Sequence, residues 1–377
     1  MRAAYEAASG GTLRIDLDAI CNNYKLIKSK TSAEVSACVK ADGYGLGLVP
    51  VARALSGVGC ATFFVASVEE GGLLRSVLPD ATIYVLNGLF AGSEAAFVEN
   101  DLRPCLSSLD EVLEWSSFCK STSAKPAALH VDTGIHRLGF KESETAAVTE
   151  LTDNFNATLL MSHLACADDA DNRLNENQRE RFDTIRSRFP KVPASLCNTA
   201  GVFLGPGFHY DLVRPGIGLY GGNPYGSPSH IRAHPFKPVV TLSARIMRVT
   251  QIEPGETVGY GASFIAKRPT RLATLAAGYA DGYFRALGSP DGSGLSVLIG
   301  GNPAPVIGRV SMDMITVDVT ELPQASINRG DFAELIGPEL TIGDIGRAAG
   351  TIGYEVLTRL GYRYRRTYTS KTGIGAA

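Results

Sequence analysis

The sequence has few of the features that mark a secreted, disulfide-bonded or membrane-embedded protein. The segment MRAAYEAASGG at its start has no basic stretch followed by an apolar run, which a secretory signal would have. No run of about 18 apolar residues occurs, the length that a membrane-spanning helix needs. The seven cysteines are scattered and never spaced C-x-x-C, which argues against a disulfide framework or a zinc site. We therefore expect a cytoplasmic protein with reduced thiols and no bound metal.

Charge of one sign is not concentrated anywhere in the chain either. Lysine and arginine together number 36, aspartate and glutamate 38, and the formal net charge is −2. The basic residues are spread along the sequence, so no basic patch is expected to bind nucleic acid or an anionic membrane surface. The apolar fraction of 45% and the charged fraction of 20% are ordinary for a globular protein. We expect neither a nucleic-acid nor a membrane partner.

The first two-thirds of the chain alternate short apolar runs with longer amphipathic segments. This alternation predicts βα units and a parallel sheet. Eight units suggest a closed (β/α)8 barrel of the TIM type, which needs about 200 residues or more. A doubly wound sheet is the alternative, because periodicity alone does not settle closure. The apolar runs expected as strands are 35–39, 60–66, 82–86, 103–106, 127–131, 158–162, 194–197 and 217–220, with helices between them, for example at 68–78, 108–119 and 172–189.

Near residue 235 the pattern changes to β-rich runs, punctuated by glycine and proline at hairpin spacing. This predicts a second, mainly antiparallel β domain. We therefore expect an α/β chain with a barrel domain over residues 12–235 and a C-terminal β domain over 236–377. The early alternating run Thr12–Leu17 is a candidate strand of the β domain's sheet. The other runs expected as strands there are 239–250, 271–277, 295–299, 304–310, 315–319 and 332–336.

Lys40 stands at the end of the first predicted barrel strand, in the sequence V-K-A-D-G-Y-G-L-G (39–47). The carboxyl ends of barrel strands form the rim at which such folds hold their active sites. The glycines of this turn allow close approach of the backbone, and Tyr44 offers a hydroxyl group. A lysine at a strand end is more often a solvated surface charge, so the position by itself leaves both interpretations open.

A second glycine-rich segment, R-P-G-I-G-L-Y-G-G (214–222), lies at the last predicted barrel strand. Loops after the last two strands of such barrels often bind phosphate, because backbone N–H groups converge there on an anion. A glycine-rich loop is also often only a turn. The segment is therefore a weak indication of an anion site.

Nine segments combine glycine, aromatic and charged residues in distinctive patterns. They are V-K-A-D-G-Y-G-L-G (39–47), H-V-D-T-G-I-H-R-L-G-F (130–140), S-H-L-A-C-A-D (162–168), C-N-T-A-G (197–201), V-R-P-G-I-G-L-Y-G (213–221), T-V-G-Y-G-A-S-F (257–264), A-G-Y-A-D-G-Y-F-R (277–285), G-R-V-S-M-D (308–313) and I-G-Y-E-V (352–356). In this order, and over nearly the whole chain, they resemble the alanine racemase family. The resemblance implies a barrel followed by a β domain, pyridoxal 5′-phosphate as cofactor, and interconversion of L- and D-alanine. The expected role is supply of D-alanine for peptidoglycan or alanine catabolism.

The resemblance also implies which residues bind the cofactor. Lys40 would bind it covalently through its amine. Arg214, which keeps its proton, would face the pyridine nitrogen and leave that nitrogen unprotonated, so that the ring is a weaker electron sink and racemisation is favoured over transamination. His163 would bridge towards Arg214. The phosphate would be held through hydroxyl and backbone N–H groups of Tyr44, Thr199, Gly216, Ile217 and Tyr354.

Racemisation needs a base on each face of a planar intermediate, and the resemblance makes these bases Lys40 and Tyr260. A free phenol titrates at about pH 10, so Tyr260 would need help from neighbouring cations. Arg137 would contact the cofactor's phenolic oxygen and the substrate carboxylate, with the backbone N–H of Met312 as a second donor to that carboxylate. A narrow access corridor, which limits substrate size, would be lined by Asp168, Tyr279, Arg285, Arg309, Ile352 and Tyr354.

Two further implications concern assembly and one departure from the family's pattern. The family resemblance implies a homodimer with shared active sites, in which Lys40 of one subunit faces Tyr260 of the other. The departure is His130, where many relatives carry a lysine modified to a carbamate that supports the arginine corresponding to Arg137. Histidine is a poor substitute for a stable anion. Either an ion such as chloride fills the gap, or Arg137 is held otherwise.

Two other functions remain open at this stage. The first is that the chain is a relative with the same fold that racemises serine or a broader range of amino acids, or that decarboxylates larger ones. The corridor tyrosines and Tyr260 argue against decarboxylation, but not against racemisation of other amino acids. A non-enzymatic pyridoxal-phosphate-binding barrel protein is less favoured. Such a protein would leave the whole β domain, with Tyr260, unexplained.

Overall fold

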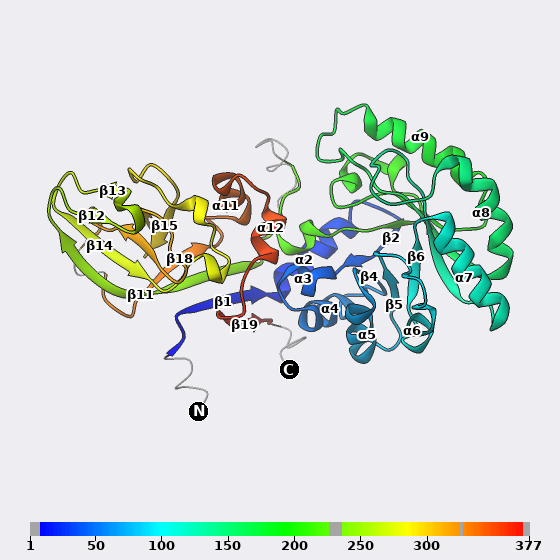
Figure 1. Cartoon of the computed structure of the whole chain (residues 1–377), viewed down its shortest axis with the longest axis horizontal. Coiled ribbons are helices and arrows are strands. Elements are labelled where there is room, and N and C mark those ends of the chain that lie inside the picture. The colour runs from blue at the N-terminus through cyan, green and yellow to red at the C-terminus, as the bar shows by residue number, and fades with distance from the viewer. Residues whose placement is uncertain (1–7, 226–235, 324–326, 372–377) are drawn as a thin grey trace. The chain divides into compact units, whose positions relative to one another are not determined.

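The computed structural model describes residues 8–225, 236–323 and 327–371. These residues form two compact units, one extending from Asp18 to Lys237 and one combining the segment up to Leu17 with Pro238–Thr372. We call them the barrel unit and the β unit (Figure 1).

The barrel unit has a curled parallel sheet of seven strands, taken in chain order from β3 to β9, with helices on its outer side (Figure 1). The strands are buried because both faces of the sheet are covered, which explains why they read as short, continuous apolar runs. Serine N-caps start two of the helices: Ser67 accepts a hydrogen bond from the N–H of Glu70, and Ser108 accepts one from the N–H of Glu111. The strands are β3 (Ala37–Cys38), β4 (Thr62–Val65), β5 (Thr82–Val85), β6 (Arg103–Leu106), β7 (Pro126–His130), β8 (Asn156–Met161) and β9 (Ala194–Ser195), and the helices are α2 (Leu17–Lys28), α4 (Leu48–Ser56), α5 (Val68–Val77), α6 (Glu94–Glu99), α7 (Leu109–Ser121), α8 (Thr145–Leu151) and α9 (Leu174–Arg186).

An eighth strand closes the sheet into a barrel. This strand, β10 (Leu212–Val213), pairs in parallel with β2 (Glu34–Val35), which runs directly into β3. On its other side the N–H of Arg214 donates to the carbonyl of Cys197, just beyond β9, at 2.9 Å. The predicted (β/α)8 barrel is thereby confirmed, and the doubly wound alternative is wrong.

The sequence-based position of the last barrel strand is wrong. It was expected at residues 217–220, but Ile217–Tyr220 forms a 3₁₀ helix, η5. The true strand, Leu212–Val213, has only two residues, too few to produce a recognisable apolar run. The run at 217–220 is apolar because all four of its residues are buried in the core.

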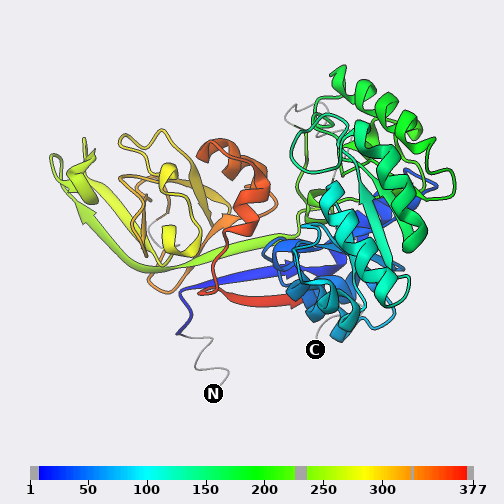
Figure 2. The ribbon, with the colours of Figure 1, turned by 45° about the vertical axis from the view of Figure 1, so that its right-hand side comes forward.

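The β unit is built on one long strand, β11 (Val240–Ile252), which pairs antiparallel with β1 (Gly11–Asp16), β14 (Thr270–Leu275) and β18 (Phe332–Ile336). Figures 1 and 2 show β1 lying beside β11, with β19 on its other side. The first half of β11 alternates buried and partly exposed residues, the pattern of a sheet with one face on a core. The remaining elements are β12 (Thr257–Val258), β13 (Phe264–Ile265), β15 (Ser296–Ile299), β16 (Asn302–Pro305), β17 (Ile315–Asp318), β19 (Arg365–Thr369), α11 (Ile342–Ala349) and α12 (Gly353–Thr358).

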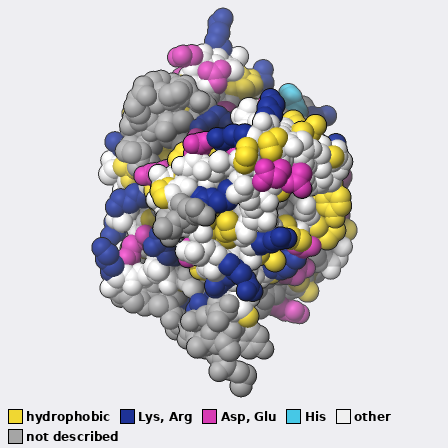
Figure 3. Space-filling view, turned by 90° about the vertical axis from the view of Figure 1, so that its left-hand side faces the viewer, with side chains coloured by type: hydrophobic (Ala, Val, Ile, Leu, Met, Phe, Trp, Pro, Cys, Tyr) yellow, Lys and Arg dark blue, Asp and Glu magenta, His cyan; other side chains and the backbone are white. Residues whose placement is uncertain are grey.

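None of the described helices is both long and apolar enough to cross a lipid bilayer. On the face of the molecule shown in Figure 3, basic, acidic and apolar side chains are interspersed.

Candidate active site

Lys40 follows β3 at the carboxyl edge of the barrel and begins a short turn labelled α3 (Lys40–Tyr44). The N–H of Val39 donates to the carbonyl of Phe64 at 2.9 Å, so the strand register holds up to the residue before the lysine. All four residues of the segment Ala41–Tyr44 have positive φ, between 53° and 62°. This left-handed region costs about 1–2 kcal/mol for each residue other than glycine. Backbone strain is thus concentrated next to Lys40, a common property of functional sites.

Two carboxylates hold this strained turn in place. Asp42 accepts a hydrogen bond from the N–H of Leu48 at 2.8 Å. The carboxylate of Glu70, on α5, accepts from the N–H of Asp42 at 3.1 Å and from the N–H of Ala66 at 2.8 Å. The sequence analysis identified neither residue as part of the site. Asp42 lies within the segment 39–47 that was singled out, whereas nothing in the sequence marks Glu70.

Four of the five residues expected at the phosphate, Tyr44, Thr199, Gly216 and Ile217, lie on loops of the barrel unit, whereas the fifth, Tyr354, lies on the β unit. The hydroxyl oxygen of Thr199 accepts hydrogen bonds from the N–H groups of Gly216 at 3.0 Å and Gly218 at 3.3 Å. Because that oxygen accepts twice, its own proton is left to donate to a ligand. Tyr44 is buried against Tyr220, with ring centroids 4.4 Å apart and nearly parallel. Ile217 is buried beside them and begins η5.

Arg214 is buried inside the barrel with neutral hydrogen-bond acceptors around it. Its guanidinium donates to the hydroxyl of Ser195 and to the carbonyls of Ser162 and Leu196, and it lies 5.9 Å from the centre of the Phe64 ring. Burial lowers the pKa of Arg214 to about 10, so that the side chain still carries its proton at neutral pH. The site therefore contains a permanent cation that no carboxylate neutralises through a hydrogen bond or ion pair among the described residues.

Two histidines stand close to this cation, at the ends of neighbouring strands. Burial lowers the pKa of His163 well below its usual value, and the positive charges of Arg214 and Arg137 lower it further. His130 behaves in the same way: burial and the same two arginines lower its pKa to about 4. Both imidazoles are therefore neutral at neutral pH. His163 also accepts a hydrogen bond at its carbonyl from the buried Gln178 at 2.8 Å, a positioning contact that the sequence did not reveal.

Arg137 is exposed at the tip of the loop that follows β7. Asp132 organises this loop: one carboxylate oxygen accepts from the N–H groups of Gly134, Ile135 and His136, and the other lies 2.8 Å from the His136 ring. Burial works to raise the pKa of Asp132, but these hydrogen bonds outweigh it and lower the pKa. The sequence analysis did not identify Asp132, although it lies inside the segment 130–140.

In the β unit, Tyr260 stands at the start of a 3₁₀ turn, η6 (Tyr260–Ala262), and is 71% exposed. The guanidinium of Arg309 packs against this turn, since a Cβ built at Gly261 would lie 3.1 Å from one of its nitrogens. The structure thus brings Arg309 and the loop of Tyr260 together.

The loops that carry Tyr279 and Met312 are joined through backbone hydrogen bonds. The N–H of Tyr279 donates to the carbonyl of Ser311, and the N–H of Ala280 to the carbonyl of Met312, both at 3.0 Å. Arg363 links these two loops, because its guanidinium donates hydrogen bonds to Asp281 at 2.6 Å and to Asp313 at 2.7 Å. The last three residues are further positioning groups that the sequence analysis missed.

The other predicted corridor residues lie at loops and helix starts. Asp168 is exposed in the loop after β8 of the barrel unit. Arg285 begins the 3₁₀ turn η8 (Arg285–Leu287), Ile352 is the N-cap of α12 and exposed, and Tyr354 lies in the first turn of α12. The predicted site residues therefore form two sets: Lys40, Tyr44, Arg137, His163, Asp168, Thr199, Arg214, Gly216 and Ile217 on the barrel unit, and Tyr260, Tyr279, Arg285, Arg309, Met312, Ile352 and Tyr354 on the β unit.

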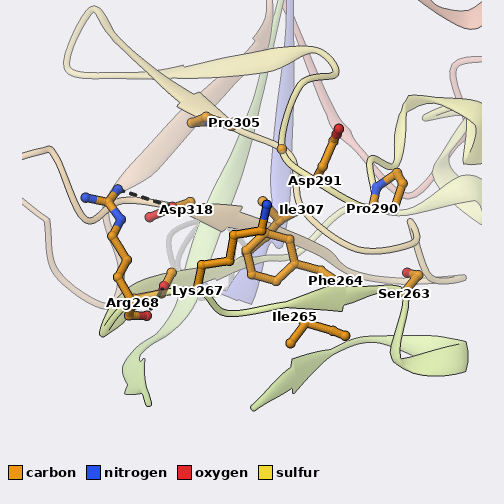
Figure 4. Close-up of a pocket in the computed structure, with 12 residues that line it drawn as sticks. Ser263, Phe264, Ile265, Lys267, Arg268, Pro290, Asp291, Pro305, Ile307 and Asp318 are labelled. Atoms are coloured by element: carbon orange, nitrogen blue, oxygen red, sulfur yellow. Dashed lines mark hydrogen bonds and ion pairs between the residues drawn. The ribbon is translucent and has the colours of Figure 1, made fainter. Parts of the chain in front are cut away.

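A separate cavity of about 630 Å³ lies within the β unit (Figure 4). Phe264, Ile265 and Ile307 supply apolar walls. Of the charged side chains around it, Arg268 pairs with Asp318 at 3.9 Å, and Asp291 accepts hydrogen bonds from Ser289 and Ser293. None of the predicted site residues lines this cavity. Its position gives no reason to assign it to the reaction.

Comparison with known proteins agrees with both halves of this description. Residues 15–224 match the family model "Alanine racemase, N-terminal domain", and residues 239–368 match "Alanine racemase, C-terminal domain". An alanine racemase of Methylobacterium nodulans is 44% identical over 98% of this chain and 99% of its own, and a biosynthetic alanine racemase of Agrobacterium fabrum is 41% identical over 94% and 93%. The crystal structure of the Bartonella henselae alanine racemase, with covalently bound pyridoxal phosphate, superposes with a TM-score of 0.90 at 37% identity, covering 96% of this chain and 100% of its own. The chain belongs to the alanine racemase family.

Proposed function

We propose that this chain is a pyridoxal-phosphate-dependent alanine racemase, an isomerase that interconverts L- and D-alanine. The observation that carries the proposal is that residues 15–224 and 239–368 match the family's two domains, while the barrel rim holds the lysine, hydroxyl and arginine groups such a reaction needs. Relatives with this name cover more than nine-tenths of the chain.

The residues of the barrel rim fit the cofactor. A Cβ at Gly216 would lie 2.2 Å from the hydroxyl oxygen of Tyr44, so the backbone is bare just where hydroxyl groups converge. A phosphate group could therefore come close to the backbone here. It would accept hydrogen bonds from the hydroxyl groups of Tyr44 and Thr199. The positive charges nearby are those of Lys40, Arg137 and Arg214, because both histidines are neutral. These cations suit a phosphate together with a substrate carboxylate.

Within this site each residue has a distinct task. When bound, pyridoxal phosphate supplies an electron sink that stabilises negative charge at the substrate Cα. Lys40 holds the cofactor through its amine and moves a proton on one face of the substrate. Arg214 keeps its proton, since its donors are fixed on Ser195 and Ser162, and so presents a cation rather than an acid. Arg137, aided by the N–H of Met312, binds the substrate carboxylate.

The second base is Tyr260, and we propose that it acts on the barrel of a second copy of the chain. Tyr260 is 71% exposed, and Met312 and Ile352 are also exposed apolar residues of the β unit. A catalytic base has to be shielded from water, and exposed apolar groups of this size often mark an interaction surface. In a two-fold homodimer each copy would cover this surface of the other, which would create two equivalent shared sites. The corridor residues Asp168, Tyr279, Arg285, Arg309, Ile352 and Tyr354 would then limit the size of the substrate.

We also propose a cytoplasmic location. Among the residues that the structure describes no cysteine forms a disulfide, and Cys38, Cys60, Cys105, Cys119 and Cys197 are buried. Unpaired thiols in this number are typical of a reducing compartment.

A panel of L-amino acids tests the proposed function directly. The purified chain, supplied with pyridoxal phosphate, should convert L-alanine to D-alanine, measured by chiral chromatography. Faster conversion of L-serine or of larger amino acids than of L-alanine would show that alanine is not the preferred substrate. No conversion of any member of the panel would contradict a racemase.

A further inference from the structure

Left-handed backbone separates Lys40 from Tyr44, the two residues of the loop after β3 that are proposed to bind the cofactor. Ala41, Asp42 and Gly43 have φ between 53° and 62° and ψ between 45° and 52°, close to the values of a left-handed helix. Tyr44 follows with a φ of 56°. Residues other than glycine rarely adopt this conformation in succession, because the Cβ atom crowds the carbonyl oxygen that follows it. The turn therefore depends on contacts from outside it.

The conformation of this turn sets the spacing between two groups of the site. Lys40 carries the amine proposed to bind the cofactor, and Tyr44 carries a hydroxyl proposed to bind its phosphate. The left-handed residues are the only chain between them. Because Tyr44 is buried and stacked on Tyr220, relaxation of the turn to an extended or right-handed backbone would displace mainly Lys40.

Glu70 supplies one contact from outside the turn. Its helix, α5, starts with Ser67 as N-cap, and the spacing S-x-x-E (67–70) is that of a capping box. In a capping box the glutamate reaches back to the N–H of the N-cap residue itself. Here the carboxylate of Glu70 accepts from the N–H of Ala66 at 2.8 Å and from the N–H of Asp42, in the neighbouring loop, at 3.1 Å. Glu70 thus joins the start of its own helix to the middle of the left-handed turn.

Asp42 extends this link to a second helix. Its carboxylate accepts from the N–H of Leu48, the first residue of α4, at 2.8 Å. The backbone of Asp42 is therefore bound to α5 and its side chain to α4. Hydrogen bonds to carboxylates are among the stronger ones in proteins. Two of them at one residue can hold a turn that its own backbone disfavours.

The same arrangement occurs a second time in the barrel, away from the predicted site residues. Ser108 and Glu111 repeat the S-x-x-E spacing at the start of α7. The carboxylate of Glu111 accepts from the N–H of Ser107 at 2.9 Å and from the N–H of Leu89, in the loop after β5, at 3.3 Å. Each glutamate therefore reaches the loop of the strand before its own. Only the loop that Glu70 reaches carries a lysine of the site, so Glu111 is a matched control.

We propose that Glu70 is a positioning residue for Lys40. By binding the N–H of Asp42 it keeps the backbone of the turn left-handed, and so it fixes where the amine of Lys40 stands relative to the hydroxyl of Tyr44. Its part is indirect, because it acts through the turn and Lys40 performs the chemistry. The inference rests on the proposed function for the cofactor and for the proton that Lys40 moves.

Hydrogen exchange of the whole, cofactor-loaded protein tests the contact itself. Glu70→Met removes the carboxylate but keeps a long side chain that favours helix. Amides of residues 40–47 should then exchange roughly tenfold faster or more, because Asp42 loses a hydrogen bond to a charged group. Glu111→Met should speed exchange at residues 86–90 and leave that of 40–47 at the parental rate. Unchanged exchange at 40–47 in Glu70→Met, or an equal rise there in both variants, would overturn the proposal.

Exchange of the substrate α-proton in D₂O separates positioning of Lys40 from a general loss of structure. In the proposed reaction Lys40 removes the α-proton of D-alanine, and Tyr260 removes that of L-alanine. At saturating cofactor, Glu70→Met should slow exchange at D-alanine by roughly tenfold or more, and exchange at L-alanine less. Glu111→Met should leave the ratio of the two rates at the parental value. Equal losses for both enantiomers in Glu70→Met would mean a general structural role and would overturn the proposal.

A second variant covers the case in which Glu70→Met does not fold. Glu70→Asp keeps the charge at the start of α5, but its side chain is one methylene shorter and should no longer reach Asp42. The same two results are expected from it, and their absence in the folded variant would equally overturn the proposal. If the unaltered chain racemised no amino acid, the proposed function would fail, while hydrogen exchange still decided whether Glu70 holds the turn.

Discussion

The hydroxyl oxygen of Tyr44 occupies the space that a side chain at Gly216 would need: a Cβ there would lie 2.2 Å from it. Gly216 has a φ of −123° and a ψ of −91°, outside the left-handed region, and the close contact with Tyr44 excludes a side chain at this position. Tyr44 cannot move aside easily because it is buried and stacked on Tyr220. A close approach of backbone and hydroxyl is what a bound phosphate requires.

Gly216→Ala should therefore weaken binding of pyridoxal phosphate by about tenfold or more, because Tyr44 is displaced and the loss of one good hydrogen bond to a charged group has this size. The matched control is Gly207→Ala, where a Cβ would meet nothing within 4 Å. Titration of the cofactor-free proteins, followed by visible absorbance, measures both affinities. Equal affinities of the two variants would show that the contact between Tyr44 and Gly216 does not shape the phosphate site.

Arg214→Glu should raise formation of pyruvate from alanine relative to racemisation. The variant replaces a cation by a carboxylate that can share a proton with the pyridine nitrogen, which makes the ring a stronger electron sink. Pyruvate is measured by a coupled reduction, and circular dichroism verifies that the barrel is folded, since Arg214 also bonds to Ser195 and Ser162. Pyruvate formation at the parental level in a folded variant would refute this role of Arg214.

The pH dependence of stability should carry the signature of His130. Its pKa is about 4 in the folded chain, against an ordinary value of about 6.5 when unfolded. Below about pH 6.5 the unfolded chain therefore binds a proton that the folded chain refuses, and the free energy of unfolding falls as the pH drops towards 4. The loss from this residue is roughly 3 kcal/mol, and His163, shifted in the same direction, adds to it. Urea unfolding measured between pH 7 and pH 4.5 should show a shallower fall for His130→Gln. An identical slope in the variant would mean that His130 is already charged in the fold.

Much of the barrel side of the site could be predicted because its residues lie in contiguous loops at strand ends. Lys40 and Tyr44 share one turn, and Arg214 and Gly216 share another, so a short sequence segment carries the information. The supports could not be predicted in this way. Glu70 reaches the strained turn from the next βα unit, and Gln178 reaches the carbonyl of His163 from α9, and neither contact is marked by a sequence pattern.

The eighth strand shows the other limit of the sequence pattern. Two residues, Leu212 and Val213, are enough to close the barrel through main-chain hydrogen bonds, but too few to show a period. The left-handed backbone of Ala41 and Asp42 was equally hidden, since neither residue type favours positive φ as glycine does. Two hydrogen bonds hold this conformation: the N–H of Asp42 donates to the carboxylate of Glu70, and the N–H of Leu48 donates to the carboxylate of Asp42.

Mixing two inactive variants should restore activity if the site is shared between subunits. Lys40→Ala chains and Tyr260→Ala chains are combined and allowed to exchange. About half of the dimers are then mixed, and in each mixed dimer one site carries both changes and the other neither. Roughly a quarter of the parental activity should return, because a quarter of all sites are intact. If exchange is proven by mass spectrometry and no activity returns, both residues belong to one chain's site.

The central claim is that Lys40 and Tyr260 serve as bases on opposite faces of the substrate, and exchange of the α-proton in D₂O tests it most directly. The Tyr260→Phe variant should retain exchange of the α-proton of D-alanine, which Lys40 removes. Exchange at L-alanine should fall by roughly 10²–10⁴-fold, the usual contribution of a general base. Proton NMR follows both enantiomers separately from the loss of their α-proton signals. A loss at L-alanine of less than about tenfold, which is below that range, or equal losses for the two enantiomers, would contradict the assignment of Tyr260 as the second base.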